Sequence, residues 1–178
     1  MTGDSPAPAP GDQATVTVSL SITPEAAFDI FTRDINLWWR RGPRFRNIDG
    51  DAGIICIEPK VGGRVFESHK SNTENEAAET VIEIGRTKVW DPPSRLVFEW
   101  RLSNFAPHEK TEVEVLFERS RSGTRVTVMH RGWSHIRPDH PARHGLARAE
   151  FVRMMGLWWG EQMSSLRVNV AKLKDAQA

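Results

Sequence analysis

The sequence has little of what marks secreted, membrane or nucleic-acid-binding proteins. It contains one cysteine, Cys56, so no internal disulfide can form, and a reducing compartment such as the cytoplasm is expected. No apolar run reaches the length of a signal peptide or a membrane span, so we expect no membrane insertion. Lysine and arginine total 24 against 23 acidic residues, and a net charge of +1 gives no reason to expect a nucleic-acid partner.

Motifs of the common catalytic classes are also missing. The sequence has no Gly-x-Ser-x-Gly, no His-Glu-x-x-His, no paired cysteines and no glycine-rich phosphate loop, and we expect no cofactor. His135, His140 and His144 invite a metal interpretation, because the last two have the spacing of helical zinc ligands. Pro141 lies between them and arginines surround them, so we expect no metal site. His140 or Asp139 is expected to cap the following helix instead.

Alternation of apolar and polar residues predicts seven strands. The clearest is 15–21, where every second residue is apolar. Gly62-Gly63 and Asp91-Pro92-Pro93-Ser94 are typical of turns between neighbouring strands. The other predicted strands are 53–58, 64–68, 80–90, 95–102, 109–118 and 124–133.

Apolar residues at steps of three or four predict three helices. Thr23-Pro24-Glu25 is a typical helix start and leads into a short helix, and a second short helix is expected over 35–39. The longest helix is expected from Asp139 to Leu173, because no proline follows Pro141. Its apolar stripe consists of Val152, Met155, Trp159, Met163, Leu166, Val170 and Leu173.

These elements predict one domain with an α+β fold. Residues 1–13 have no bulky apolar residue after Met1 and are expected to be a disordered tail, with a second short tail at 175–178. Residues 14–174 show no internal repeat, so a single domain is expected. In it, an antiparallel sheet that is apolar on one face needs the long helix to cover that face.

Short motifs spread over about residues 15–173 carry a family resemblance. They are Thr23-Pro24-Glu25-Ala26-Ala27-Phe28, Trp38-Trp39, Gly62-Gly63, the hairpin 89–100, Thr111-Glu112-Val113, 123–128 and His130-Arg131-Gly132-Trp133. Together they resemble the activator of HSP-90 ATPase homologue (Aha-type) family of the START-like (SRPBCC) superfamily. The resemblance implies a helix-grip fold: a curved seven-stranded antiparallel sheet around the C-terminal helix, two short helices between the first two strands, and often a cavity. Eukaryotic activators carry a further N-terminal domain, so chaperone stimulation is not carried over to this sequence.

Seven tryptophans and eight phenylalanines supply all the aromatic residues, since tyrosine is absent. They are expected either to fill the core or to line an apolar pocket for a flat or hydrophobic ligand. Gly156 and Gly160, one turn apart in the long helix, indicate either close packing or space left for a ligand. The residues that we assign to the pocket are Trp38, Trp39, Phe66, Phe98, Trp100, His130, Met155, Trp158 and Trp159.

Arginine is concentrated in two segments, 40–46 and 119–153. These charges are either solvated loop residues or a cationic rim that attracts an anionic ligand group or an acidic partner. The predicted rim residues are Arg40, Arg41, Arg44 and Arg131.

Three functions remain open. The leading hypothesis is a non-catalytic protein that holds a small hydrophobic ligand between sheet and C-terminal helix. The second is an enzyme of the polyketide-cyclase or aromatase type, with His130 as the polar catalytic group; alternation places His130 on the inner sheet face, where it is otherwise a satisfied core residue. The third is an interaction module that contacts a chaperone or a regulator. The sequence indicates neither the ligand nor the oligomeric state.

Overall fold

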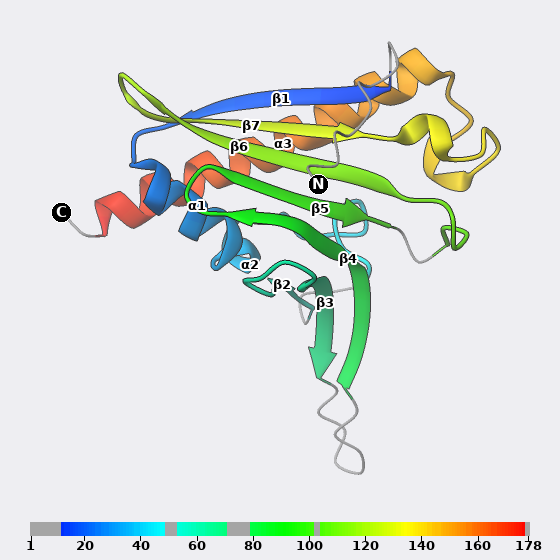
Figure 1. Cartoon of the computed structure of the whole chain (residues 1–178), viewed down its shortest axis with the longest axis horizontal. Helices are drawn as coiled ribbons and strands as arrows, with labels where there is room; N and C mark the ends of the chain where they lie inside the picture. Colours follow the sequence, from blue (N-terminus) through cyan, green and yellow to red (C-terminus); the bar gives the residue numbers. More distant parts are fainter. Residues whose placement is uncertain (1–11, 49–52, 71–78, 102–103, 177–178) are drawn as a thin grey trace, which may run out of the picture.

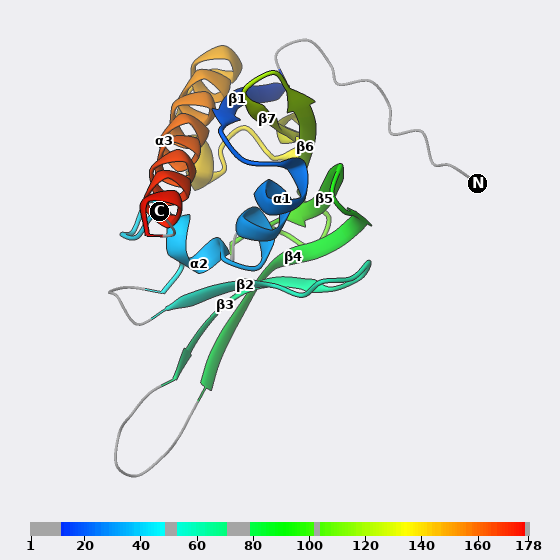
Figure 2. The same cartoon turned by 90° about the vertical axis from the view of Figure 1, so that its left-hand side faces the viewer.

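A seven-stranded antiparallel sheet curls around one long helix, which confirms the predicted α+β helix-grip fold (Figures 1 and 2). The computed structural model describes residues 12–48, 53–70, 79–101 and 104–176. The strand order is β1-β7-β6-β5-β4-β3-β2. The strands are β1 (Gln13–Leu20), β2 (Ile54–Ile57), β3 (Arg64–Lys70), β4 (Glu79–Asp91), β5 (Arg95–Trp100), β6 (Thr111–Ser120) and β7 (Gly123–Arg131). The helices are α1 (Pro24–Thr32), α2 (Ile35–Trp38), the 3-10 helices η1 (Trp133–His135) and η2 (Pro141–Arg143), and α3 (Arg148–Asp175).

The sheet is strongly curved, and its concave side holds the helices. Figure 2 shows β1, β7 and β6 on one side of α1 and the strands β4, β3 and β2 on the other, while α3 closes the open side. Beyond this curve β3 and β4 continue as a projecting two-stranded arm (Figure 1). The α3 helix makes its closest approach to the sheet along the edge strand β1.

Alternation in the strands forms the core. Val113, Val115 and Val128 on the inner face are fully buried, and Val115 pairs directly with Val128 across β6 and β7. From α3, the apolar stripe brings Trp159 and Leu166 to the same cluster, both with 0% exposure. Burial of each such side chain stabilises the fold by roughly 1.5–3 kcal/mol, so this face of α3 holds the helix against the sheet.

The two short helices orient adjacent tryptophans differently. The α1 helix begins where predicted, with Thr23 Oγ1 accepting a hydrogen bond from the backbone N–H of Ala26 (3.3 Å). In α2, Trp38 turns back onto α1, and its indole Nε1 donates to the carbonyl of Ile30 (3.1 Å). Trp39 follows the helix in an extended conformation and points toward the concave interior. The α2 helix therefore uses one tryptophan as an anchor and presents the next one to the site described below.

The long helix begins later than the sequence predicts. It starts at Arg148 rather than near Asp139 and runs for 28 residues, about 42 Å. His144 (φ 51°) and Gly145 (φ 69°) adopt left-handed conformations, which cannot continue a right-handed helix. His140 is a helix cap, but of the short η2 helix: its Nδ1 accepts from the Ala142 N–H (3.0 Å).

The first described residues, Asp12 and Gln13, lie at the end of the predicted N-terminal tail. Asp12 is buried and accepts hydrogen bonds from Ser134, from the backbone N–H (2.5 Å) and from Oγ (2.9 Å), and Gln13 is the first residue of β1. These two residues belong to the domain, whereas the rest of the predicted tail, 1–11, and the end of the C-terminal tail, 177–178, lie outside the described residues. In the described part of the chain no helix has the length and apolar character needed to cross a membrane.

Candidate functional site

A cavity of about 580 Å³ lies at the end of the sheet where β5 finishes. Three segments border it and leave it partly open to solvent: a strap of residues 42–47 that follows α2, the loops around η1 and η2, and the first turns of α3. Its wall is mainly apolar, and the polar groups lie at a few positions. The apolar lining comprises Pro43, Phe45, Trp100, Trp133, Pro141, Ala142, Met154, Met155 and Trp158, and the polar lining comprises Arg44, Arg46, Asn47, Asn104 and His144.

The aromatic wall rests on a fixed base of further tryptophans. Trp39 stacks on Trp100 with ring centroids 5.6 Å apart and meets Trp158 and Trp159 edge-on at 5.6 and 5.7 Å. Trp39 and Trp159 are almost fully buried, with 2% and 0% exposure, whereas Trp158 stays partly exposed at the cavity. Offset and edge-on contacts of this kind each add roughly 0.5–1.5 kcal/mol beyond area burial. These contacts fix how the rings of the wall are oriented.

Two indole hydrogen bonds hold the strap over this wall. Trp39 Nε1 donates to the carbonyl of Phe45 (2.9 Å), and Trp158 Nε1 donates to the carbonyl of Arg44 (2.7 Å). The Phe45 ring also lies 5.6 Å from the ring of Trp158. Gly42 begins the strap with φ 98°, a conformation that other residues rarely adopt.

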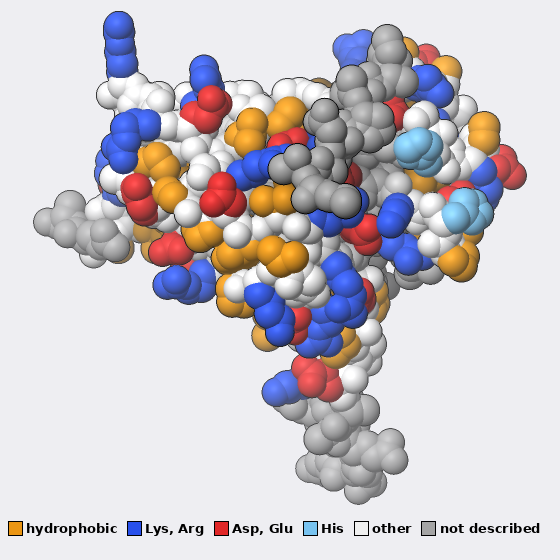
Figure 3. All heavy atoms as spheres, in the orientation of Figure 1, with side chains coloured by type: hydrophobic (Ala, Val, Ile, Leu, Met, Phe, Trp, Pro, Cys, Tyr) orange, Lys and Arg blue, Asp and Glu red, His pale blue; other side chains and the backbone are white. Residues whose placement is uncertain are grey.

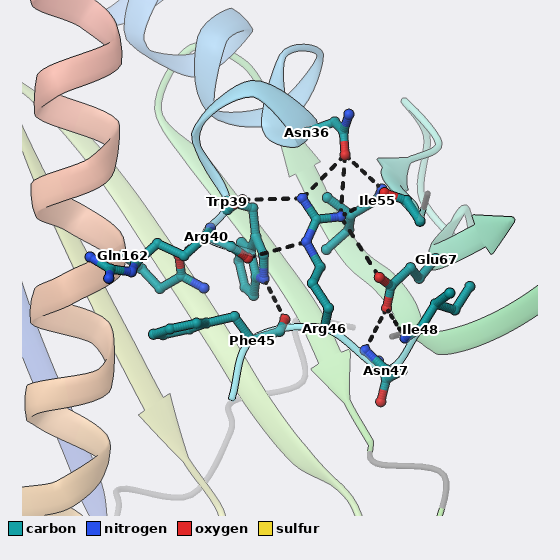
Figure 4. A network of polar contacts seen from close by, with 11 residues as sticks. Asn36, Trp39, Arg40, Phe45, Arg46, Asn47, Ile48, Ile55, Glu67 and Gln162 are labelled. Carbon is teal, nitrogen blue, oxygen red and sulfur yellow. Dashed lines mark hydrogen bonds and ion pairs between the residues drawn. The ribbon is translucent and has the colours of Figure 1, made fainter. Parts of the chain in front are cut away.

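Arg46 anchors the far end of the strap in the interior (Figure 4). Its guanidinium donates to Asn36 Oδ1 (3.2 Å) and to the carbonyls of Trp39 (3.1 Å) and Arg40 (3.2 Å). It also lies 3.8 Å from Glu67 Oε1 on β3, and the two side chains are 2% and 1% exposed. Burial lowers the pKa of Arg46, and the Glu67 carboxylate partly offsets this.

Glu67 completes the anchor from the side of the sheet. Its Oε2 accepts hydrogen bonds from the backbone N–H groups of Asn47 (2.7 Å) and Ile48 (3.3 Å). The buried ion pair with Arg46 thus connects the strap to β3 through both a side chain and the main chain. A buried charge that loses its partner is strongly unfavourable, so this pair fixes where the strap lies.

His130 lies on the inner face of the sheet but not at the cavity. It is fully buried; its Nδ1 accepts a hydrogen bond from Trp159 Nε1 (3.1 Å), and its Nε2 lies 2.8 Å from Thr111 Oγ1. Burial lowers its pKa to about 3, so the ring is neutral at physiological pH. Because Nδ1 accepts, Nε2 carries the proton and donates to Thr111, whose hydroxyl donates to the carbonyl of Trp100 (3.0 Å). Both ring nitrogens are therefore occupied by structural partners.

The structure brings only some of the predicted pocket residues together. Trp100, Met155 and Trp158 line the cavity, and Trp39 lies directly behind Trp100. Phe66 lies on the face of β3 opposite the buried Val65 and Glu67, with the guanidinium of Arg64 4.7 Å from its ring. The predicted residues that lie in the core rather than in the lining are Trp38, Phe98, His130 and Trp159.

The predicted cationic rim is divided between two faces of the protein. Arg44 lines the cavity, Arg40 lies over the Phe45 ring, and Arg41 is exposed beside them. Arg131 lies on the outer face of the sheet, where it pairs with Glu112 (2.6 Å) and with a second carboxylate of β6. Figure 3 shows the mixture of basic and acidic side chains that covers this outer face. Arg131 is therefore separated from the cavity by the sheet itself.

Several site residues were missed by sequence reasoning. Arg46 belongs to the arginine-rich segment 40–46 but not to the predicted rim, and no motif marks Glu67 of β3, yet both are buried. Trp133 is predicted as the end of the strand 124–133, but β7 ends at Arg131 and Trp133 lines the cavity from η1. It packs against Phe151 at the start of α3, with ring centroids 4.7 Å apart, in a small second apolar cluster that also contains Phe105 and Ile136. Contacts between loops and a distant helix leave no periodic signal in a sequence.

A buried carboxylate fixes the loops on the opposite side of the cavity from the strap. Glu109 accepts hydrogen bonds from Arg137 Nη1 (2.5 Å) and from the backbone N–H of Ala106 (2.8 Å). These bonds, with that of Ala106 the largest contribution, lower the pKa of Glu109 to about 2. His140 donates through Nε2 to the carbonyl of Asn104 (3.2 Å), a residue of the cavity lining. The loop that carries Asn104 is thus held by ionic and neutral hydrogen bonds.

The three histidines considered for a metal site have separate surroundings. Both ring nitrogens of His140 have protein partners, as described above, whereas His135 and His144 are exposed. Among the described residues, no group of three or more His, Cys, Asp or Glu side chains has an arrangement that could hold a metal ion.

The two glycines of α3 are not explained by close packing. A Cβ atom placed on Gly156 or Gly160 would meet no atom within 4 Å. The lining residues Met154, Met155 and Trp158 lie on a different side of the helix, so the glycines leave space outside the cavity.

A curved sheet that grips a long C-terminal helix defines the helix-grip class of START-like proteins. The chain belongs to the family of activator of Hsp90 ATPase homolog 1-like proteins, whose family model matches residues 21–170. The comparison with curated proteins gave no significant match.

Solved structures show the same fold at low sequence identity. The protein of unknown function SA2116 from Staphylococcus aureus aligns with a TM-score of 0.63 and 12% identity, over 92% of this chain and 95% of that one. Protein MLL2253 from Mesorhizobium loti has a TM-score of 0.57 and 15% identity, over 90% and 97% of the two chains. DynU16, a protein of the dynemicin biosynthetic locus, has a TM-score of 0.58 and 15% identity, over 90% of this chain and 47% of its own. At these identities the likeness concerns the fold alone.

Proposed function

We propose that this protein binds a small hydrophobic, flat ligand in the cavity beneath the strap, without catalysing a reaction on it. The cavity itself is the observation that carries the proposal. Its volume of about 580 Å³ lies within the range of roughly 300–1,000 Å³ that is usual for small-molecule sites. Trp100, Trp133 and Trp158 offer aromatic surface to a planar molecule, and few polar groups converge on it.

The burial of His130 is the reason for proposing binding rather than catalysis. A general acid or base must reach the substrate within hydrogen-bond distance, directly or through one water. His130 is enclosed by Trp159 and Thr111, and its lowered pKa keeps it neutral. The cyclase alternative relied on this residue, so we do not assign it a catalytic role.

A chaperone or regulator contact is a separate possibility that the family name suggests. It would need a continuous exposed apolar surface. The large exposed apolar side chains of the described residues belong to α2, β2, the turn before β3, β4 and α3. They are Leu37, Ile54, Val61, Val81, Leu157 and Val168. Because these side chains are spread over five parts of the fold, we place ligand binding first.

We also propose that the protein acts in the cytoplasm, because its single cysteine, Cys56, is a free thiol.

Filling the cavity tests the proposal. The uncharged dye N-phenyl-1-naphthylamine fluoresces strongly in apolar sites, so a titration gives its affinity. Ala142 lines the cavity, and Ala142→Phe should weaken dye binding at least about tenfold, because the new ring occupies the ligand's space. Ala149→Phe is the matched control, since Ala149 is exposed on α3 and does not line the cavity. Equal affinities of the wild type and both variants would contradict the proposal.

A further inference from the structure

Two arginines at the cavity share a single carboxylate. Arg40 Nη2 lies 3.7 Å from Glu161 Oε2, and Arg44 Nη1 lies 3.5 Å from Glu161 Oε1. Both guanidinium groups also lie over the ring of Phe45, at 5.1 and 5.4 Å from its centroid. Because Arg44 and Phe45 both line the cavity, this cluster of two cations and one anion lies at its border.

Arg46 in the strap and Arg131 on the outer face of the sheet are neutralised differently from this cluster. Arg46 has a carboxylate, an amide and backbone carbonyls around it, and Arg131 on the outer face has two carboxylates. Among the ion pairs between described residues, Glu161 is the only carboxylate paired with Arg40 or Arg44. The cluster of two arginines and Glu161 therefore carries a net charge of one positive unit.

The ion pairs with Glu161 are also long ones. Charge-assisted hydrogen bonds between guanidinium and carboxylate are usually about 2.7–2.9 Å long, well below the two distances found here. The Glu161 side chain is 35% exposed, so its carboxylate can return to water with little desolvation cost. A ligand anion that makes short bonds to both guanidinium groups would replace these long contacts with better ones.

We propose that the ligand carries one anionic group, of the carboxylate or sulfonate kind, which binds between Arg40 and Arg44 in exchange for Glu161. This rests on the proposed function, because the apolar body of the same ligand occupies the cavity. Phe45 lies between the apolar cavity and the charged cluster: its ring contacts the ring of Trp158, and both guanidinium groups lie over it. The site thus selects amphipathic molecules with a flat apolar part and an acidic end. Glu161 is the internal anion that occupies the arginines in the empty site.

Two dyes of the same skeleton separate the anion from the apolar body. The anionic dye is 1-anilinonaphthalene-8-sulfonate, and N-phenyl-1-naphthylamine has the same rings without the sulfonate. For Arg44→Gln we expect about a 5- to 10-fold loss of affinity for the anionic dye and less than about a 2-fold change for the neutral dye. For Glu161→Gln we expect about a 3- to 5-fold gain for the anionic dye only, because its competitor is removed. Arg167→Gln and Glu118→Gln are the charge-matched controls; both residues are exposed and neither lines the cavity.

Ionic strength gives a second measurement that needs no variant. The side chains of Arg40 and Arg44 are 45% and 62% exposed, so salt screens them. Affinity for the anionic dye should fall several-fold between about 0.05 and 0.5 M salt, while that for the neutral dye should not fall. Equal responses of the two dyes, to salt or to the variants, would overturn the anion site alone. Failure of both dyes to bind the wild type would overturn the proposed function together with it.

Discussion

The indole N–H of Trp159 donates a hydrogen bond to Nδ1 of His130 over 3.1 Å, and this contact decides what the histidine can do. It fixes the tautomer with the proton on Nε2, which then donates to Thr111. A histidine held in this way connects α3 to β7 and β6 and has no free nitrogen for a substrate.

The neutral, buried state of His130 predicts a pH dependence of stability. Its pKa is lowered to about 3 in the folded state and is about 6.5 in the unfolded chain. The stabilisation is therefore complete above about pH 6.5 and is lost as the pH falls toward 3, because only the unfolded state takes up the proton. Between pH 7 and pH 5, the free energy of unfolding should fall by about 2 kcal/mol, measured by urea denaturation.

Two variants isolate this contribution. His130→Gln should be less stable than the wild type at pH 7, and its stability should change much less between pH 7 and pH 5. His135→Gln, at an exposed histidine, should keep the full wild-type slope. An unchanged slope in His130→Gln would show that the pKa of His130 is the same in the folded and unfolded states, which would contradict its burial as a neutral ring.

The buried pair of Arg46 and Glu67 predicts a strongly non-additive response. Arg46→Met leaves Glu67 without its cation and should lower the free energy of unfolding by about 3–5 kcal/mol. The double variant Arg46→Met/Glu67→Leu should recover much of this loss, because neither charge then remains buried. A double-mutant cycle by urea denaturation measures the coupling.

An exposed pair supplies the comparison for that cycle. Arg33 and Asp29 lie 3.4 Å apart on α1 with side chains 76% and 57% exposed, and their coupling should be below about 1 kcal/mol. Coupling of the same small size for Arg46 and Glu67 would show that the strap is not anchored by this pair.

Replacing the two glycines of α3 should stabilise the protein. A Cβ on Gly156 or Gly160 meets open space, and alanine has a higher helix propensity than glycine. Each substitution to alanine should therefore add about 0.5–1 kcal/mol to the free energy of unfolding. Dye binding should stay unchanged, because neither glycine lines the cavity. Gly85→Ala is the opposite case, because its Cβ would lie 1.6 Å from the carbonyl oxygen of Glu99. Thermal denaturation should show a much lower melting temperature for this variant.

Much of the fold was predictable from the sequence, because alternation and helical spacing reflect burial directly. The inner positions of β6 and β7 follow from such patterns. The start of α3 was not predictable in this way, since it depends on the left-handed conformations of His144 and Gly145 rather than on apolar spacing.

The site was less predictable than the fold. Trp38 and Trp39 are adjacent in sequence, yet one anchors α2 to α1 and the other supports the cavity wall, because neighbouring residues at a helix end point in different directions. Phe45 reaches the cavity from a loop, where no periodic pattern exists, and Trp133 from η1, just beyond the end of β7. The burial of Arg46 could not be predicted either, because it depends on contacts with Asn36 and Glu67, which are not its neighbours in sequence.

The most direct test of the central claim is an NMR titration that follows the seven tryptophan indole N–H signals as N-phenyl-1-naphthylamine is added. Each signal can be assigned by single substitution. Ligand binding in the cavity predicts the largest shifts at Trp100, Trp133 and Trp158, which line it, and small shifts at Trp38 and Trp90, which pack against α1. Saturable shifts confined to the first group would support the account. No saturable shift, or shifts centred on Trp38 and Trp90, would contradict it.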